Sequence, residues 1–163
     1  MPVKVRRAVE SDAPALVAMI NRAFEVERFF IASDRIDLEE VRKRLVRGEF
    51  LIAHGGQGGH GSHGSDNAGC VYIEPRGERC YLGLLSVDPD LQGTGLGRGL
   101  MQAAEQRARE LRCDFMDILV VNLREELLPF YRYLGYVEAG TSDFTAGVQT
   151  LLPCHFLKMS KRL

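Results

Sequence analysis

The chain has 163 residues, of which 45% are hydrophobic and 26% are charged, and its formal net charge at pH 7 is −1. These values are ordinary for one soluble globular domain spanning residues 1–163. The near-neutral balance gives no general attraction to nucleic acid or to an anionic membrane, and no apolar stretch approaches the length needed to span a bilayer. We therefore expect a cytoplasmic protein with neither a nucleic acid nor a membrane as partner.

The N-terminal segment predicts a strand followed by a helix. Apolar and basic residues alternate from Val3 to Ala8, as in a strand with one exposed face. Apolar residues then recur at helical spacing, with Ser11 as the expected N-cap and Pro14 tolerated in the first turn. The apolar face of this helix is expected to contain Leu16, Val17, Met19, Ile20, Ala23 and Phe24.

A second helix is predicted from Ile36 to Arg47, with Gly48 ending it. Its inward face is expected to contain Leu38, Val41, Leu45 and Val46. The segment before it, Phe24 to Ile31, mixes three aromatic with three charged residues and shows no clean period. This segment is a candidate lining for a pocket, although core aromatics and solvated charges would explain it equally well.

Two adjacent antiparallel strands are predicted at Phe50–Ala53 and Gly69–Ile73. The stretch between them, residues 54–67, is rich in glycine and nearly free of apolar side chains, so it is expected to form a mobile hairpin loop. Its three histidines could bind a metal, but their spacing matches no known site and ordering so many glycines is costly. We therefore predict no metal.

The centre of the chain predicts a buried strand, a glycine-rich turn and a helix. An apolar run from Cys80 to Val87 ends at Asp88-Pro89, and residues 92–99 then lead into apolar positions at helical spacing as far as Leu111. The first amides of a helix lack intrahelical partners and the helix dipole favours negative charge there, so such a loop is suited to phosphate. A plain turn, or close packing of helix on strand, is the alternative interpretation.

The glycine spacing distinguishes among the known phosphate loops. The dinucleotide pattern G-x-G-x-x-G is not met from any of these glycines, and no Gly-Lys-Ser/Thr follows as in nucleotide-triphosphate loops. The loop does match Q-x-x-G-x-G through Gln92, Gly95 and Gly97.

A second central strand is predicted at Phe115–Val121, parallel to the first through a right-handed crossover. A helix is then expected to begin near Leu127, because Pro129 is tolerated only in its first turn, and to end at a left-handed Gly135. The remaining chain predicts a short strand at Tyr136–Glu138, a polar loop through Gly147 and a long strand from Val148 to Ser160. Pro153 suggests a bulge or an edge position in that last strand.

The four cysteines are predicted to be buried, reduced thiols. They are widely spaced and form no C-x-x-C pair: Cys70, Cys80, Cys113 and Cys154. An even number of cysteines is compatible with disulfides, but a cytosolic chain of this size does not need them.

Two segments carry a resemblance to a known family. The Q-x-x-G-x-G loop and the F-Y-x-x-x-G-Y segment formed by Phe130-Tyr131 and Gly135-Tyr136 resemble the signatures of the GCN5-related N-acetyltransferase (GNAT) superfamily, in matching order and separation. The resemblance implies a three-layer α/β (α+β) fold, with a mixed sheet of about six to seven strands and about four helices. It also implies acetyl-coenzyme A (acetyl-CoA) as cosubstrate, no metal, and transfer of acetyl to a primary amine.

The same resemblance assigns the cofactor contacts. It places the pyrophosphate on the loop formed by Gln92, Gly93, Thr94, Gly95, Leu96, Gly97 and Arg98, and the pantetheine arm on the main chain of Leu85, Ser86 and Val87. Asn122, which follows the second central strand, corresponds to a cofactor or acceptor contact.

Tyr131 falls on the family's tyrosine position and is the predicted general acid for the departing thiolate. Tyr133 competes for this role, but two residues on a helix point about 200° apart, so only one of them can face the cofactor. Glu27, Phe29 and His155 are candidate acceptor contacts. The general base stays open: the positions near the family's glutamate are Glu78 and Arg79, so that carboxylate is not clearly supplied, and Glu27, His155 and a chain of waters are the alternatives.

The acceptor is expected to be a small-molecule amine or a protein amine, and the protein a monomer or homodimer. Two alternatives share the glycine loop: a non-catalytic coenzyme A-binding domain, and an acyltransferase for a longer acyl-CoA. A protein-interaction domain that merely keeps the fold is a third, which would not bind coenzyme A.

Overall fold

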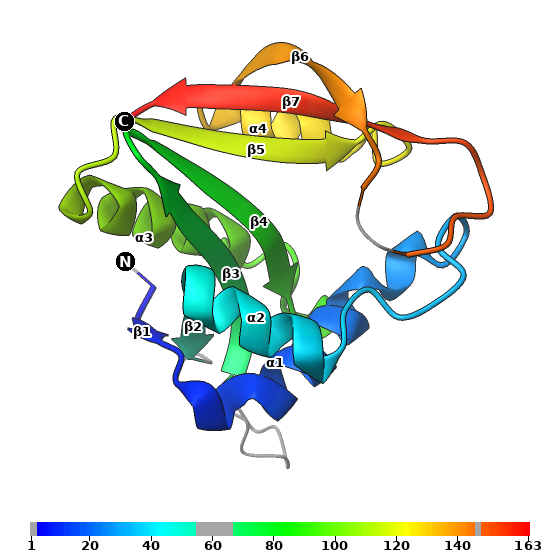
Figure 1. Ribbon diagram of the computed structural model, residues 1–163, viewed down its shortest axis with the longest axis horizontal. Coiled ribbons are helices and arrows are strands. Elements are labelled where there is room, and N and C mark those ends of the chain that lie inside the picture. Colours follow the sequence, from blue (N-terminus) through cyan, green and yellow to red (C-terminus); the bar gives the residue numbers. More distant parts are fainter. Residues whose placement is uncertain (1–2, 55–66, 146–147) are drawn as a thin grey trace.

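The computed structural model describes residues 3–54, 67–145 and 148–163. Within these residues, seven strands form one mixed sheet in the order β1-β2-β3-β4-β5-β7-β6 (Figure 1). The strands are β1 (Val5–Arg7), β2 (Glu49–His54), β3 (Asn67–Arg76), β4 (Arg79–Val87), β5 (Phe115–Val121), β6 (Val137–Asp143) and β7 (His155–Arg162). The helices are α1 (Ala13–Ala23), α2 (Leu38–Arg47), α3 (Leu96–Glu110) and α4 (Leu127–Tyr133), with single 3-10 turns η1 (Glu10–Asp12), η2 (Phe24–Glu27) and η3 (Pro89–Leu91).

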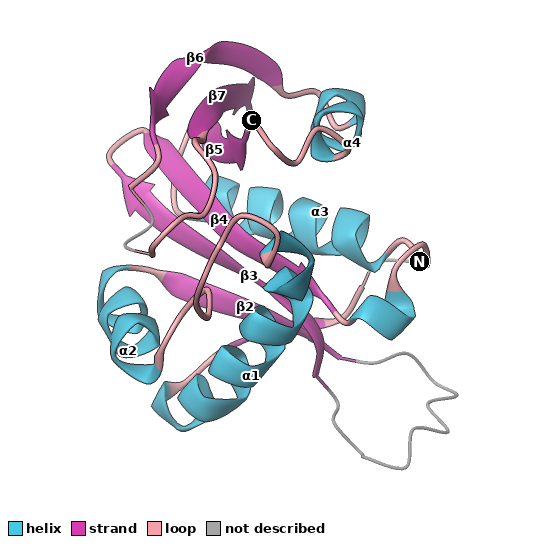
Figure 2. Cartoon of the chain, turned by 90° about the vertical axis from the view of Figure 1, so that its right-hand side faces the viewer, coloured by secondary structure: helices cyan, strands magenta, loops and turns pink. Residues whose placement is uncertain are grey.

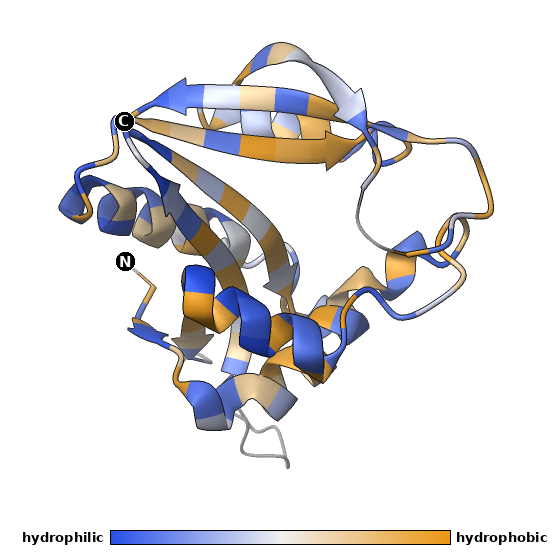
Figure 3. Ribbon diagram, viewed as in Figure 1, coloured by the Kyte–Doolittle hydropathy of each residue, from blue (hydrophilic) through white to orange (hydrophobic). Residues whose placement is uncertain are grey.

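The elements form three layers, which confirms the predicted mixed α/β fold (Figure 2). One core cluster lies between the sheet and α3 with α4, and includes Leu100, Met116 and Tyr136. A second cluster lies between the opposite face of the sheet and α1 with α2, and includes Leu16 and Phe50. Figure 3 shows apolar residues gathered along β5 and a hydrophilic outward side on α2, as burial of one helix face requires.

The sheet is split between its two central parallel strands. The ladder between β4 and β5 runs only from Arg79–Phe115 to Leu82–Ile118, and beyond it the two strands diverge (Figure 1). A register shift between β3 and β4 falls at the same place, and Leu84 there has a φ of 54°, which is rare for a residue other than glycine. Such a bulge bends the strand and interrupts its pairing. The second half of β4 therefore faces β5 across a gap.

The beginnings of α1 and α2 differ from the predictions. Asp12, not Ser11, is the N-cap of α1, because Ser11 lies inside the preceding 3-10 turn. The α2 helix begins at Leu38 rather than Ile36, since the Asp37 carboxylate accepts a hydrogen bond from the Glu40 amide (2.8 Å) and caps the helix there.

At the end of α2, the prediction for Val46 was wrong and the prediction for Gly48 is confirmed. Val46 is 87% exposed, because the buried face is completed by Val41 and the half-buried Leu45 and the next position lies about 100° further round the helix. Gly48 follows the helix as predicted, and its backbone there is extended with φ −154°. A Cβ at Gly48 would lie 2.2 Å from the carbonyl oxygen of Ile73, so the glycine permits close packing.

The C-terminal strands differ from the prediction in extent. Strand β6 continues to Asp143, because it pairs with β7 along nearly its whole length. Strand β7 begins at His155, so the expected strand from Val148 was wrong for its first residues: Pro153 has no amide for a ladder, and only an isolated bridge joins Thr150 to Ile31.

Several other predictions concern burial and extent. Cys70, Cys80 and Cys113 are buried free thiols as predicted, while Cys154 is half-buried. His54 ends β2, and residues 55–66 of the predicted glycine- and histidine-rich loop lie outside the described residues. In the part of the chain that the structure describes, no helix combines the length and apolarity needed to cross a bilayer.

Glu105 on α3 joins the two halves of the fold. Its side chain is buried, and it accepts hydrogen bonds from the Tyr136 hydroxyl (3.0 Å) and the Lys161 ammonium on β7 (2.8 Å). Glu105→Ala leaves a buried hydroxyl and an ammonium without this partner, and is expected to lower the free energy of unfolding by about 1–3 kcal/mol. Urea unfolding checks this. Glu110→Ala on the same helix removes only an exposed pair with Arg107, so a loss as large in this control would contradict the explanation.

Candidate active site

A cavity of about 410 Å³ occupies the split between β4 and β5. Its lining comes from the diverging ends of the two strands, the glycine loop (Gln92–Arg98), α4, the end of α1 with the segment that follows it, and Phe144 and Phe156 at the C-terminal strands. The lining from the two strands consists of Tyr81, Leu82, Gly83, Leu84, Leu85 and Val87 of β4 and Ile118 to Val121 of β5. Because the sheet is open here, the cavity is lined from both of its faces.

The two sides of the cavity are lined by residues from different core clusters. Phe130 and Tyr131 belong to the core on the α3 and α4 side, and with the glycine loop they line one part of the cavity. Phe24 and Tyr81 belong to the core on the α1 and α2 side, and with Glu27 they line the other. Two reactants can therefore approach the split from opposite faces of the sheet.

The glycine loop has the backbone geometry of an anion site. Gly93 and Gly95 have φ values of 80° and 87°, and no atom lies within 4 Å of a Cβ added at either position. Glycine is thus required here by the left-handed backbone rather than by packing. Gly95 is the N-cap of the 15-residue α3, so the amides of the first turn have no intrahelical acceptor.

Most of the predicted loop residues face the cavity. Its lining includes Gln92, Gly93, Gly95, Gly97 and Arg98. Thr94 and Leu96 are not among the lining residues, and the Thr94 hydroxyl donates to the carbonyl oxygen of Leu91. The guanidinium of Arg98 lies over the ring of Tyr133, 5.5 Å from its centroid.

Of the predicted residues at the strand ends, some line the cavity and others do not. Leu85 and Val87 line the cavity, whereas Ser86 is buried and its hydroxyl donates to the carbonyl oxygen of Leu84 (2.9 Å). The side-chain oxygen of Asn122 accepts a hydrogen bond from the His155 amide (2.8 Å). Asn122 thus joins the end of β5 to the start of β7, and it is not a lining residue.

Of the two competing tyrosines, Tyr131 faces the cavity. It is 8% exposed, whereas Tyr133 is 74% exposed on the other side of α4. Burial raises the pKa of Tyr131 to about 12, and Tyr81 and Glu27 act in the same direction while Arg124 opposes them. The phenol therefore keeps its proton throughout the neutral pH range.

Glu27 is the predicted acceptor contact that the structure places in the cavity. Its side chain is buried and accepts a hydrogen bond from Arg124 Nη1 (2.8 Å). Burial raises the pKa of Glu27, although Arg124 acts against this shift. The other two predicted acceptor contacts are exposed and do not line the cavity: Phe29 packs its edge on Phe30, and His155 lies at the start of β7.

The two residues near the family's glutamate position lie outside the lining of the cavity. The main-chain carbonyl oxygen of Glu78 accepts hydrogen bonds from the amides of Asp114 and Phe115. The Arg79 guanidinium donates two hydrogen bonds, each of 2.7 Å, to the Asp117 carboxylate. Neither residue lines the cavity. Among the residues that the structure describes, Glu27 is therefore the one carboxylate that lines the cavity.

Three polar lining residues were missed from the sequence. Arg124 follows the end of β5 by three positions, and the carboxyl end of a central strand was the available signal for it. Tyr81 was hidden in an apolar run, and Arg35 lies in a segment without periodicity.

The comparisons with known proteins agree with this geometry. A family model described as an acetyltransferase (GNAT) domain matches residues 34–162. The chain belongs to the GNAT acetyltransferase family. It is 25% identical over 145 residues to the peptidyl-lysine N-acetyltransferase YjaB of Escherichia coli K12, covering 88% of each chain.

Another relative is a partial match. The chain is 37% identical over 67 residues to the mycothiol acetyltransferase of Propionibacterium freudenreichii, and this match covers 41% of the chain but only 20% of that relative.

Solved structures share the fold over nearly the whole chain. A ribosomal-protein-alanine N-acetyltransferase from Brucella melitensis has a TM-score of 0.75 at 22% identity and is covered completely, as is 99% of this chain. YncA of Salmonella typhimurium, described with acetyl-CoA, has a TM-score of 0.72 at 17% identity, with 100% of this chain and 95% of that chain covered. These likenesses confirm the GNAT fold.

Proposed function

We propose that the protein is an acetyl-CoA-dependent N-acetyltransferase that transfers the acetyl group directly from the thioester to a primary amine. One observation carries this proposal: the cavity runs through the split between β4 and β5, with the glycine loop on one side and the buried Tyr131 beside it. Membership of the GNAT family, and the acetyl-CoA described with the YncA structure, support the choice of cofactor.

Two surfaces of the cavity would bind acetyl-CoA. The free amides at the start of α3 would bind the pyrophosphate, and Arg98 would add a charge-assisted contact. Along the second half of β4 the ladder to β5 has ended, so main-chain groups of Leu85 and Val87 are available to the pantetheine amides. Acetyl-CoA supplies the activated acyl group.

Transfer also requires stabilisation of the oxyanion and a proton for the leaving thiolate. A main-chain amide at the bulge of β4 is suited to the oxyanion, because it is held by the sheet and not used in the β4–β5 ladder. The Tyr131 phenol is protonated at neutral pH and faces the cavity, so it can protonate the sulfur as the C–S bond breaks. Glu27 lies on the side from which the amine would arrive.

The direct test is thiol release from acetyl-CoA in the presence of a panel of amines, combined with calorimetric titration of coenzyme A. Acetylation of any primary amine with release of one thiol per acetyl group supports the proposal. Coenzyme A binding without transfer would instead favour a non-catalytic domain. Transfer only from longer acyl-CoA would favour a different acyltransferase, and absence of binding would favour an interaction domain.

Gly97→Ala tests whether the glycine loop holds the cofactor. A Cβ at this position would lie 3.6 Å from Val87 and 3.8 Å from Phe130, which are ordinary contacts, so the fold should be unchanged or slightly stabilised. The added methyl group projects into the cavity lining, where it would keep the pyrophosphate from the amides. We expect the Kd for acetyl-CoA to rise at least about tenfold, or about 1.4 kcal/mol, by calorimetry. Unchanged affinity in a folded variant would remove the loop from the site.

A further inference from the structure

Arg35 is a cationic residue of the cavity that the proposed transfer does not use. It lies between η2 and α2, is half-buried, and lines the part of the cavity that also contains Phe24, Glu27 and Tyr81. This part belongs to the α1 and α2 side of the sheet, opposite the glycine loop. Arg35 therefore lies where the acceptor, rather than acetyl-CoA, would bind.

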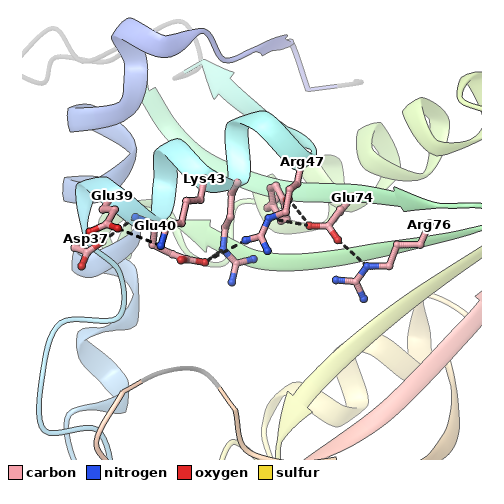
Figure 4. Close-up of polar contacts among 9 residues, drawn as sticks. Asp37, Glu39, Glu40, Lys43, Arg47, Glu74 and Arg76 are labelled. Carbon is pink, nitrogen blue, oxygen red and sulfur yellow. Dashed lines mark hydrogen bonds and ion pairs between the residues drawn. The ribbon is translucent and has the colours of Figure 1, made fainter.

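The guanidinium of Arg35 has no ion pair and no side-chain hydrogen bond within residues 3–54, 67–145 and 148–163; its contact is with the ring of Phe24, 5.5 Å away. The basic residues of the neighbouring helix are all paired. Figure 4 shows Lys43 beside Glu39 (3.1 Å), and Arg47 beside Glu40 (3.5 Å) and Glu74 (3.9 Å). Arg44 pairs with Glu40 at 3.0 Å.

The carboxylate that lines the cavity with Arg35 is already used by another arginine, and Glu40, which also acts on Arg35, is paired with Arg44 and Arg47. Glu27 is held at 2.8 Å by Arg124, which also pairs with Glu126. Burial lowers the pKa of Arg35, while Glu27 and Tyr81 act to raise it, so the group is partly removed from water without a bonded counterion. A guanidinium in this situation gains most from a ligand that brings a carboxylate, because the planar fork matches that group with two parallel hydrogen bonds.

We propose that the acceptor is a small primary amine that carries a carboxylate, and that Arg35 binds this carboxylate. The inference rests on the proposed acetyl transfer and adds the substrate class to it. The amine of such a ligand would extend from Arg35 towards Glu27 and the split in the sheet. A polyamine or an internal lysine side chain would instead bring only positive charge to Arg35, which is repulsive.

Matched acceptor pairs test the substrate class. Thiol release is measured with the proteinogenic L-amino acids and with their primary amides, alongside spermidine and an end-blocked lysine peptide. The ammonium group of an amino-acid amide loses its proton more readily than that of the free amino acid. Without recognition of the carboxylate, the amide would therefore react at least as fast as the amino acid. We expect at least one acid to have a kcat/KM about 100-fold above that of its amide, equivalent to two parallel charge-assisted bonds.

Variants assign that preference to Arg35. Arg35→Met is expected to reduce the acid-to-amide ratio to near one, mainly by raising KM for the acid, and Arg35→Lys to retain part of it. Arg47→Met is the matched control, since Arg47 is paired outside the cavity and its loss should leave the ratio unchanged. Two results would overturn the proposal. One is an equal fall in kcat/KM for acid and amide in Arg35→Met. The other is a wild-type preference for amides, spermidine or the peptide over every acid.

A binding measurement separates this inference from the proposed activity. The same acids and amides are titrated by calorimetry into the protein in the presence of excess coenzyme A, which needs no turnover. Carboxylate-dependent binding that Arg35→Met abolishes supports the ligand class even if no acetyl group is transferred. Absence of binding by every acid, or equal binding of acid and amide, contradicts it.

Discussion

Replacing Tyr131 with phenylalanine is expected to lower kcat by about 10²–10⁴-fold and to leave the Kd for acetyl-CoA nearly unchanged. The ring of Tyr131 is buried beside the cavity, so phenylalanine preserves its packing and removes only the hydroxyl. Without that proton donor the thiolate must leave unprotonated or take a proton from water. Stopped-flow thiol release under saturating acetyl-CoA measures the rate, and calorimetry measures the affinity.

Tyr133→Phe is the matched control for this variant. Tyr133 is on the same short helix but 74% exposed and outside the cavity, so its kcat should equal that of the wild type. The pH profile adds a second check. With its pKa raised to about 12, Tyr131 stays protonated well above neutral pH, so kcat should not fall between about pH 7 and pH 10. A kcat that survives Tyr131→Phe, or a loss shared by the Tyr133 variant, would remove Tyr131 as the acid.

Replacing Arg124 with methionine is expected to lower the free energy of unfolding at pH 8 by about 3–5 kcal/mol. The loss arises because the variant leaves the Glu27 carboxylate without its cation: Glu27 is 5% exposed, and its Oε2 lies 2.8 Å from Arg124 Nη1. Removing one member of a buried pair leaves an uncompensated charge. Urea unfolding followed by circular dichroism measures the loss.

The pH dependence and a double variant identify this cause. Burial raises the pKa of Glu27 in the folded state above its ordinary value of 4.5, so the folded state binds this proton more tightly than the unfolded chain. The stability that Arg124→Met loses relative to the wild type should therefore be smallest at low pH, where Glu27 is protonated, and should grow as the pH rises through the folded pKa. Glu27→Gln combined with Arg124→Met should recover part of the loss at pH 8. A loss equal at pH 5 and pH 8, with no recovery in the double variant, would show that only packing of Arg124 matters.

The central part of the fold could be predicted from the sequence because its signals are local. Strand β5 begins and ends at the predicted residues, α3 begins at Leu96, and Gly135 has the expected left-handed backbone. In these segments the apolar periodicity, the glycine positions and the prolines all favour one structure. The same local signals identified the loop and the Tyr131 segment that carry the resemblance to the GNAT family.

The features that make the cavity were not predictable in this way. The split depends on a bulge at Leu84, a residue type that gives no warning of a positive φ. The pair of Glu27 and Arg124 joins positions 97 residues apart in the chain, and no periodicity links them. Arg35 lines the cavity only because the segment after η2 folds against β4, placing it near Tyr81. Sequence patterns specify elements, whereas tertiary packing decides which charges share a cavity.

A crystal structure of the protein with coenzyme A tests the central claim most directly. The account predicts the pyrophosphate on the amides of the glycine loop, the pantetheine arm between the diverging ends of β4 and β5, and the sulfur beside the Tyr131 hydroxyl. Coenzyme A bound elsewhere, or a saturated crystal in which the split between the strands holds no ligand, would contradict it.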